Sequence, residues 1–384
     1  MRILYLIPSL DRSGGAEQAI ASLTGPLAER GVILDVVTFG GGRVGAAGSL
    51  AERVEEAGGQ VSSLEPGGRV GQVRQVRALV AARRPDLVHT TLFDADVVGR
   101  VAGRTAGTPV VSSLVNVAYG PEQRANPALR PWKLETVRWI DRATARSVRR
   151  FHALSPHVAE VMGRRLGIRP DRIDVIPRGR DAAALGEPTT ARRTRVRASL
   201  GADDDRLVVV AAARHEFQKG LDVLIAAWPS VRAAHPDAVL LIGGRTGNET
   251  GRLEAAIEAQ GAEAGIELLG ARDDVADLMV ASDVFVVPSR WEGFGSILVE
   301  AMALGVTLVA SDVGPVAEVV GTGWARLVPP DRPDVLAAAV LDAAGQGDAE
   351  RERRAATARA RFAEHFRIDV VADATAEFYR RALA

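Results

Sequence analysis

The sequence predicts an α/β protein made of two doubly wound parallel-sheet domains that face each other across a cleft. Short apolar runs rich in β-branched residues alternate with helix-length amphipathic stretches, which is typical of βαβ units. The alternation stops at residues 181–205 and then starts again. One open sheet holding every predicted strand would be unusually wide, so two domains are the simpler arrangement for 384 residues.

The first domain is predicted to cover residues 1–180. Its apolar runs have the length and composition of strands. The predicted strands span residues 2–7, 33–39, 60–64, 87–92, 110–115, 151–154 and 173–176. Residues 181–205 combine an arginine cluster with no clear apolar periodicity, so they are predicted to form a linker.

The second domain is predicted to cover residues 206–367. Its predicted strands span residues 207–212, 238–242, 266–269, 284–287, 307–310 and 325–328, with helices such as 221–234 and 335–344 between them. Residues 368–384 hold a further amphipathic helix candidate. Its apolar side chains, Val371, Ala374, Phe378 and Ala382, recur at helical spacing.

Composition excludes several classes of protein. The chain has no cysteine, so it has no disulfide framework and no thiol nucleophile, which fits a reducing cytoplasm. Six histidines leave little capacity for a metal site, and none is predicted. The net charge of the chain is zero. Nucleic acid is not predicted to be a partner. The apolar run before Pro8 is too short for a secretory or membrane-spanning segment, so a cytoplasmic location is predicted.

One group of polar and glycine residues follows the predicted strand at 284–287. The segment from Gly293 to Ser296 lies where this strand turns into a helix, and such a turn presents N–H groups and the positive end of the helix dipole to an anion. Glu300 lies in the first turns of that helix and is placed to accept hydrogen bonds from sugar or ribose hydroxyls, while Glu292 precedes the glycines. Each carboxylate alone is best interpreted as a solvated side chain, but together they favour a ligand site.

A second group, containing Arg214, Lys219 and Gly220, follows the predicted strand at 207–212. Open α/β domains bind ligands at this carboxyl end of the sheet. Two cations there suit a diphosphate, and they would neutralise the charge that develops on a leaving phosphate. Taken alone, the pair would be interpreted as ordinary surface cations.

Together these residues resemble a known family. The segment from Glu292 to Glu300 is similar to the E-x7-E signature of glycosyltransferase family four, which comprises retaining, nucleotide-sugar-dependent enzymes with the GT-B fold. Arg214, Lys219 and Gly220 resemble that family's phosphate-binding turn, and residues 13–17 resemble its N-terminal glycine loop. The resemblance covers nearly the whole chain and implies that the helix at 368–384 returns to the N-terminal domain.

The resemblance implies roles for the matching residues. The expected catalytic residues are Glu292, Arg214, Lys219 and His89. The residues expected to contact the nucleotide-sugar are Gly14, Gly15, Arg214, Lys219, Phe294, Gly295, Ser296 and Glu300. The implied reaction retains anomeric configuration, forms an α-glycosidic bond and requires neither a metal nor another cofactor. A UDP-sugar is favoured over a GDP-sugar as donor, and the acceptor is a small molecule, a glycan or a lipid-linked molecule.

Some positions depart from the family pattern. Val115 stands where the family often has a histidine, with Asn116 beside it as an alternative hydrogen-bonding group. Arg178 stands where an asparagine is usual. His89 resembles a second family histidine, although a packed strand residue is an equal interpretation from sequence. These departures concern the donor sugar and the acceptor more than the nucleotide.

Two other functions compete with glycosyl transfer. A nucleotide-sugar epimerase would keep the nucleotide contacts but would need acid and base groups at the sugar. A non-catalytic two-domain sugar-binding protein would need no phosphate turn. Residues 127–151 also contain a basic helix candidate with Trp132 and Trp139, so weak peripheral membrane contact is a hypothesis beside the simpler interpretation of a solvated helix face.

Overall fold

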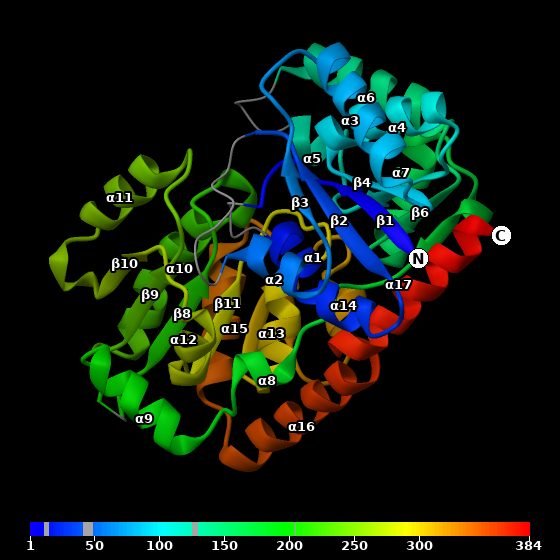
Figure 1. The fold of residues 1–384 in the computed structure, drawn as a ribbon. Coiled ribbons are helices and arrows are strands. Elements are labelled where there is room, and N and C mark those ends of the chain that lie inside the picture. The colour runs from blue at the N-terminus through cyan, green and yellow to red at the C-terminus, as the bar shows by residue number, and fades with distance from the viewer. Residues whose placement is uncertain (11–14, 41–48, 125–129, 204) are drawn as a thin grey trace. The chain divides into compact units, whose positions relative to one another are not determined.

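The computed structural model describes residues 1–10, 15–40, 49–124, 130–203 and 205–384. The chain divides into two compact units. Unit 1 comprises Met1–Asp181 and His365–Ala384, and unit 2 comprises Ala182–Glu364. Each unit is a parallel sheet with helices on both faces (Figure 1), which confirms the predicted fold class of two doubly wound domains.

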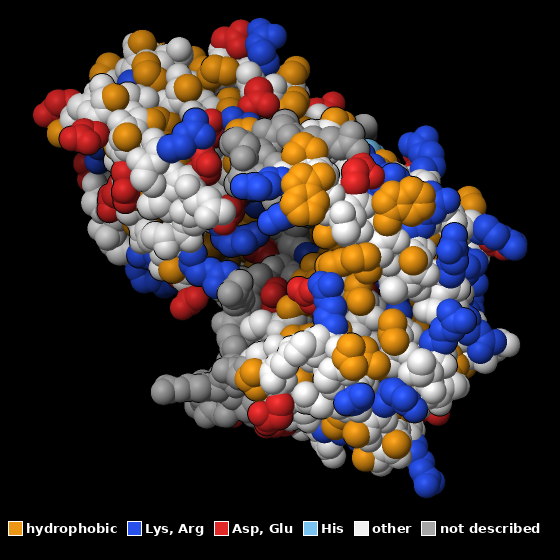
Figure 2. All heavy atoms as spheres, turned by 90° about the horizontal axis from the view of Figure 1, so that it is seen from above, with side chains coloured by type: hydrophobic (Ala, Val, Ile, Leu, Met, Phe, Trp, Pro, Cys, Tyr) orange, Lys and Arg blue, Asp and Glu red, His pale blue; other side chains and the backbone are white. Residues whose placement is uncertain are grey.

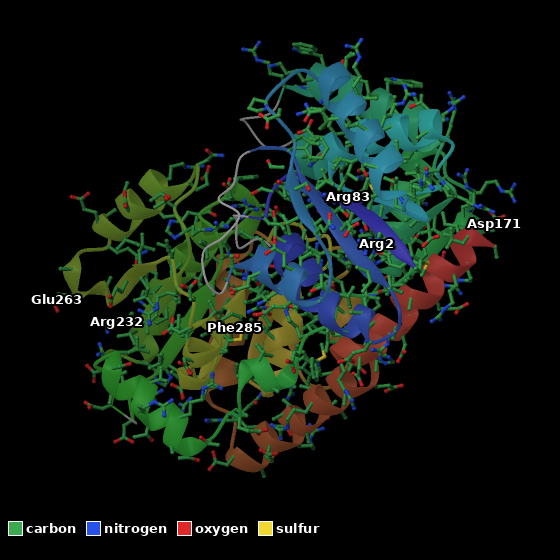
Figure 3. The ribbon with its side chains drawn as sticks, viewed as in Figure 1. Arg2, Arg83, Asp171, Arg232, Glu263 and Phe285 are labelled. Atoms are coloured by element: carbon green, nitrogen blue, oxygen red, sulfur yellow. The ribbon has the colours of Figure 1, made fainter. Side chains whose placement is uncertain are left out.

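The sheet of unit 1 has seven parallel strands in the order β3-β2-β1-β4-β5-β6-β7. The order reverses between β1 and β4, which are neighbours. Arg2 at the start of β1 forms an ion pair of 2.8 Å with the buried Asp35 of β2 (Figure 3). The strands are β1 (Arg2–Leu6), β2 (Ile33–Thr38), β3 (Val61–Ser63), β4 (Leu87–Thr91), β5 (Val110–Leu114), β6 (Arg150–Ala153) and β7 (Ile173–Val175).

The helices of unit 1 cover the two faces of this sheet. On one face α3 (Arg69–Arg83), α4 (Phe93–Ala106), α6 (Pro131–Ala145) and α7 (Pro156–Leu166) bury an aliphatic core. On the other face α1 (Gly15–Ala28), α2 (Leu50–Glu56) and α17 (Ile368–Leu383) bury a second core. A short helix, α5 (Pro121–Arg124), and a 3-10 turn, η1 (Pro170–Arg172), complete the unit.

The sheet of unit 2 has six parallel strands in the order β10-β9-β8-β11-β12-β13. The order reverses between β8 and β11, and Phe285 on β11 is fully buried (Figure 3). The strands are β8 (Val208–Ala212), β9 (Val239–Gly243), β10 (Ile266–Gly270), β11 (Val284–Val287), β12 (Leu308–Ser311) and β13 (Arg326–Val328).

The helices of unit 2 enclose a core that includes the fully buried Trp228. The α-helices are α8 (Ala182–Leu185), α9 (Thr190–Ser199), α10 (Leu221–Ala234), α11 (Thr250–Glu258), α12 (Val275–Ala281), α13 (Ser296–Leu304), α14 (Val316–Val320), α15 (Pro333–Ala344) and α16 (Asp348–His365, of which the last residue belongs to unit 1). The 3-10 turns are η2 (Phe217–Lys219) and η3 (Ala262–Ala264). Among the described residues, no helix has the length and apolarity needed to span a membrane.

The segment predicted as a linker, residues 181–205, instead contains α8 and α9, which belong to unit 2. Thr189 caps α9 by accepting a hydrogen bond from the Arg192 N–H group. The helix then packs through charge: Arg192 contacts Asp277 at 2.6 Å, and Arg193 and Arg197 both contact Asp283. Because ion pairs supply much of the contact, the helix lacks the apolar periodicity on which the prediction relied.

A buried charged cluster joins α4 to α6 in unit 1. The Arg100 guanidinium is 1% exposed and contacts Asp141 at 2.6 Å and Asp96 at 3.5 Å. The Tyr119 hydroxyl donates to the second oxygen of Asp141 at 2.8 Å. Burial raises the pKa of Asp96 to about 6, against the opposing effect of Arg100. Arg100 is therefore the cation that makes two buried carboxyl groups tolerable.

The chain passes from unit 1 to unit 2 and back again. Arg180, before the first passage, lies beside Arg367, after the second, as an isolated parallel β-bridge. The Arg180 N–H group donates to the Phe366 carbonyl at 2.8 Å, and the Ile368 N–H group donates to the Arg180 carbonyl at 3.0 Å. From there α17 packs against α1 and buries Phe378 and Tyr379 in unit 1.

Candidate functional site

The reversal of strand order in unit 2 brings two loops together. In open α/β sheets, ligands bind outside the carboxyl ends of the strands at such a switch point. One loop follows β8 and contains Arg214 and η2, and the other follows β11 and leads to Gly295 and α13. The Arg290 N–H group donates to the Gln218 carbonyl at 2.8 Å, which joins the loops through their backbones.

At the junction of these loops, Lys219 and Glu292 form an ion pair. The Lys219 Nζ atom lies 2.6 Å from Glu292 Oε1, and the Ser289 hydroxyl donates to the same oxygen at 2.8 Å. The Glu292 side chain is 7% exposed, whereas that of Lys219 is 21% exposed. The structure therefore holds these two predicted site residues in one contact, with the lysine more accessible than the carboxylate.

Two glycines allow the backbone to follow this path. Gly220 has a φ of +60°, and a Cβ atom there would lie 2.1 Å from the Pro288 carbonyl oxygen. Gly295 has a φ of +80°, and a Cβ atom there would lie 2.7 Å from the Leu298 side chain. Both values are in the left-handed region that glycine adopts most readily. The first glycine sets the approach of the two loops, and the second sets the start of α13.

Arg290 braces the two loops, and the sequence analysis missed it. Its guanidinium makes a bidentate pair with Asp222 at 2.7 and 2.9 Å, donates to the Phe217 carbonyl and contacts Asp331 at 2.7 Å. It also stacks over the Phe217 ring, 4.1 Å from the centroid. This arginine therefore fixes the turn that carries Lys219. The only sequence signal for Arg290 was its position between the predicted strand at 284–287 and Glu292.

Further cations lie near the ends of β8 and β9. The Arg214 side chain is exposed, and neither it nor the Arg245 side chain makes a hydrogen bond or ion pair with another residue that the structure describes. His215 follows Arg214 in the chain, and its backbone N–H group donates to the Arg245 carbonyl at 3.1 Å. Its imidazole is 2% exposed, and burial lowers its pKa, so it is a neutral side chain. Positive charge in this loop therefore comes from the arginines and Lys219.

The remaining predicted residues of unit 2 lie at the start of α13. Phe294 is 2% exposed and packs inside the loop, whereas Ser296 and Glu300 are partly exposed. Glu300 lies one turn after Ser296, on the first half of α13. The N-terminus of this helix offers N–H groups and positive potential near Lys219's loop. The loops after β8 and β11 therefore carry cations and helix N–H groups, the kinds of group that suit a phosphorylated ligand.

Of the predicted residues of unit 1 that the structure describes, Gly15 is exposed and His89 is buried. Gly15 begins α1, while Ser13 and Gly14 lie outside the described residues. His89 on β4 is 3% exposed, and both of its ring nitrogens are engaged: Nδ1 lies 2.7 Å from the Tyr379 hydroxyl and Nε2 lies 2.7 Å from the Ser113 hydroxyl. Burial lowers the pKa of His89 well below its usual value. The structure thus places His89 in the packing of α17 against the sheet, the second of the two interpretations offered by the sequence.

His89 belongs to a series of hydrogen bonds in which every donor and acceptor can be assigned. His152 Nε2 faces the Ile176 carbonyl at 2.8 Å, so it must carry a proton and leave Nδ1 as an acceptor. Ser113 then donates to His152 Nδ1 at 3.0 Å and accepts from His89 Nε2, which leaves His89 Nδ1 to accept from Tyr379. Both imidazoles are neutral in this arrangement, and the hydrogen bonds connect α17 with β4, β5 and β6.

Tyr379, His89, Ser113 and His152, which form this series of hydrogen bonds, line a small cavity of about 50 Å³. Val115 and Arg178, the two positions that depart from the family pattern, also line it. Asn116 points its side chain elsewhere, because its Oδ1 accepts from the adjacent Val117 N–H group at 2.9 Å. The cavity is large enough for water but not for a sugar ring.

Acid should destabilise unit 1 through His152. Burial lowers the pKa of His152 from 6.5 to about 4. As pH falls, this imidazole therefore binds a proton at a higher pH in the unfolded chain than in the folded protein. The stabilisation is fully present above about pH 6.5 and is lost as pH falls towards 4, with a size of about 2 kcal/mol after allowing for partial exposure. Chemical denaturation between pH 7 and pH 4.5 should show a smaller loss for His152→Gln than for the native chain. An equal loss in the two proteins would contradict this assignment, because Asp96 contributes equally to both.

Known proteins resemble both halves of this chain. The family model described as "Glycosyl transferases group 1" matches residues 192–361, and the model described as "Glycosyltransferase Family 4" matches residues 13–184. A D-inositol 3-phosphate glycosyltransferase of Rhodococcus opacus is 31% identical over 312 residues, which cover 77% of this chain and 67% of that protein. The protein of the same name from Streptomyces griseus is 29% identical and is covered over 86% of its length.

Solved structures give the same result. HepE of Anabaena, determined in complex with UDP and glucose, has a TM-score of 0.83 and 25% identity, with 99% of each chain covered. Sucrose-phosphate synthase of Thermosynechococcus elongatus has a TM-score of 0.84 at 22% identity, with 99% of this chain and 98% of that one covered, which supports the fold alone. The chain therefore has the GT-B fold and belongs to the group 1 glycosyltransferases of glycosyltransferase family 4.

Proposed function

We propose that this chain is a retaining glycosyltransferase that moves a sugar from a UDP-sugar to an acceptor hydroxyl and forms an α-glycosidic bond without a metal. The observation that carries the proposal is the Lys219–Glu292 contact at the switch point of unit 2. The exposed Arg214 lies in the same loop as Lys219, and Glu292 lies in the loop that leads to α13. The similarity to HepE, whose structure was determined with UDP and glucose, supports UDP over GDP. A cytoplasmic location remains a prediction.

The proposed chemistry is electrostatic. Arg214, Lys219 and the N–H groups at the start of α13 hold the diphosphate and stabilise the negative charge that grows on it as the bond to the sugar breaks. Lys219 exchanges part of its contact with Glu292 for the phosphate, which frees Glu292 to accept hydrogen bonds from sugar hydroxyls. A phosphate oxygen takes the acceptor's proton, so the protein need not supply a base. Accordingly, His89 has no part in this proposal.

Nucleotide release from a panel of UDP-, GDP- and dTDP-sugars tests the proposal. A UDP-sugar should release UDP in the presence of a chelator, and the glycosidic product should be the α-anomer by NMR. A C-epimerised nucleotide-sugar as the main product would identify an epimerase instead. Tight donor binding with no release from any donor and acceptor combination would favour a sugar-binding protein, although the family assignment argues against that alternative.

Glu300→Ala should weaken UDP binding. In the proposal this carboxylate accepts hydrogen bonds from the ribose hydroxyls, and removing the acceptor costs roughly 1 to 3 kcal/mol. Isothermal titration with UDP should show the dissociation constant rising by about ten-fold or more. Glu258→Ala, an exposed carboxylate on α11, is the matched control and should leave UDP affinity unchanged. Equal affinities for all three proteins would remove the ribose role of Glu300.

A further inference from the structure

The outward side of α3, α4 and α6 in unit 1 concentrates exposed apolar side chains. Among the described residues, the large hydrophobic side chains exposed on this face are Val70 (68%), Val101 (38%), Trp132 (63%) and Trp139 (58%), and only Val175 and Val370 are exposed elsewhere. The three helices are neighbours, because α4 contacts both α3 and α6. We call this surface the α3–α4–α6 face (Figure 1).

The two exposed tryptophans are not needed for packing. The inward side of α6 carries Leu134 and Val137, which pack against the core, and Asp141, which pairs with Arg100. Trp132 and Trp139 are seven positions apart, so both project from one side of the helix, away from that core. Two solvent-exposed indole rings on one side of a folded helix are unusual, and they indicate a surface that binds a membrane or another macromolecule.

Cations surround both rings. Lys133 lies 5.7 Å from the Trp132 ring centroid, and Arg138 and Arg142 lie 5.5 and 5.6 Å from that of Trp139. On α6 the surface carboxylate Glu135 is already paired with Arg138 at 2.9 Å. Figure 2 shows orange hydrophobic side chains among blue Lys and Arg side chains on this side of the molecule. The aromatic side chains are therefore embedded in positive charge.

A second row of cations lies on α3 and its C-cap residue, Arg84. Arg74, Arg77 and Arg84 are exposed, and they make no ion pair with any other part of the chain that the structure describes. They border an open groove of about 750 Å³ between α3 and the end of α4. The α3 segment contains no acidic residue, so this row is not neutralised within its own helix.

We propose that the α3–α4–α6 face docks on a bilayer surface rich in anionic phospholipid. An indole ring settles at the level of lipid headgroups, where its apolar body and polar N–H group are both accommodated. Long cationic side chains beside it extend to the lipid phosphates, and the arginines of α3 add attraction that falls off with salt. This inference concerns unit 1 and does not rest on the proposed donor site, which lies in unit 2. It extends the hypothesis for residues 127–151 to two further helices.

Tryptophan fluorescence of the full chain tests the proposal directly. Of the five tryptophans, Trp228, Trp291 and Trp324 are buried, so a change on vesicle binding reports Trp132 and Trp139. Vesicles of equal parts phosphatidylcholine and phosphatidylglycerol should bind at least roughly ten-fold more tightly than pure phosphatidylcholine vesicles. Emission should shift to the blue, brominated lipid should quench it, and about 0.5 M NaCl should weaken binding.

Two variants and one control complete the test. Both W132A/W139A and R74Q/R77Q/R84Q should lower vesicle affinity by roughly ten-fold, while circular dichroism and UDP binding stay unchanged. R195Q/R332Q/R353Q removes the same number of positive charges from exposed positions of unit 2. This control should bind vesicles as tightly as the native chain does. Absence of binding to anionic vesicles would overturn the proposal. So would equal loss in the control, or tighter binding to heparin or DNA that needs the arginines but not the tryptophans.

Discussion

Lys219→Ala should lower the turnover number for UDP release by about 10²- to 10³-fold, the usual effect of removing one charge-stabilising donor from a transition state. The ammonium group of Lys219 is held by Glu292 at 2.6 Å and lies at the switch point of unit 2. In the proposed reaction the diphosphate gains negative charge only as its bond to the sugar breaks, so the loss should appear more in kcat than in donor affinity. Steady-state and pre-steady-state measurements of UDP release check this.

The controls for Lys219 separate chemistry from folding. Lys219→Arg keeps the charge and should recover part of the turnover, while Arg195→Ala removes an exposed cation of α9 and should leave it unchanged. Removing Lys219 also leaves the buried Glu292 with Ser289 as its remaining partner in this contact, so thermal unfolding must be compared for each variant. A native turnover number in a folded Lys219→Ala protein would refute leaving-group stabilisation.

Arg100→Met should have the largest effect on stability, about 3 to 5 kcal/mol from unit 1. Its guanidinium is 1% exposed and contacts both Asp96 and Asp141. Without it, two carboxyl groups stay buried beside each other with no cation, and one of them must bind a proton for the fold to survive. The temperature of the unfolding transition of unit 1 should fall by roughly 10 °C.

Neutralising the partners of Arg100 distinguishes charge from packing. Asp96 is already costly to ionise, as its pKa of about 6 shows, so Asp96→Asn should cost little at pH 7. Adding Asp96→Asn and Asp141→Asn to Arg100→Met removes all three charges and should restore part of the lost stability. If the triple variant were no more stable than Arg100→Met, lost packing rather than unpaired charge would explain the effect.

The central strands of unit 2 were predictable because they are short, continuous apolar runs rich in β-branched residues. β8 and β11 are examples, and helix α10 begins and ends at the predicted residues. In contrast, α9 was missed because Arg193 and Arg197 hold it through Asp283 rather than through apolar contacts. Charge pairs carry no periodic signal, so composition alone made that segment look like a linker.

The candidate site was predictable in part for a similar reason. Both of its loops follow apolar strands, which marks them as carboxyl-end loops of a parallel sheet. That Lys219 contacts Glu292 depends on β8 and β11 being neighbours, and strand order is not encoded in the local pattern of either strand. The bracing by Arg290 depends on Asp222, 68 positions away. The burial of His89 depends on Tyr379 of α17, at the far end of the sequence.

The return of the chain to unit 1 through the Arg180–Arg367 bridge has a consequence for biosynthesis. On the ribosome, the first 181 residues emerge without α17, so Tyr5, Ile20 and Leu27 lack the part of their packing that α17 supplies. Unit 2 is contiguous and holds all its parts as soon as Glu364 has emerged. The half that is translated first is therefore the half that finishes folding last, and its unfinished apolar surface is a natural target for chaperones during synthesis.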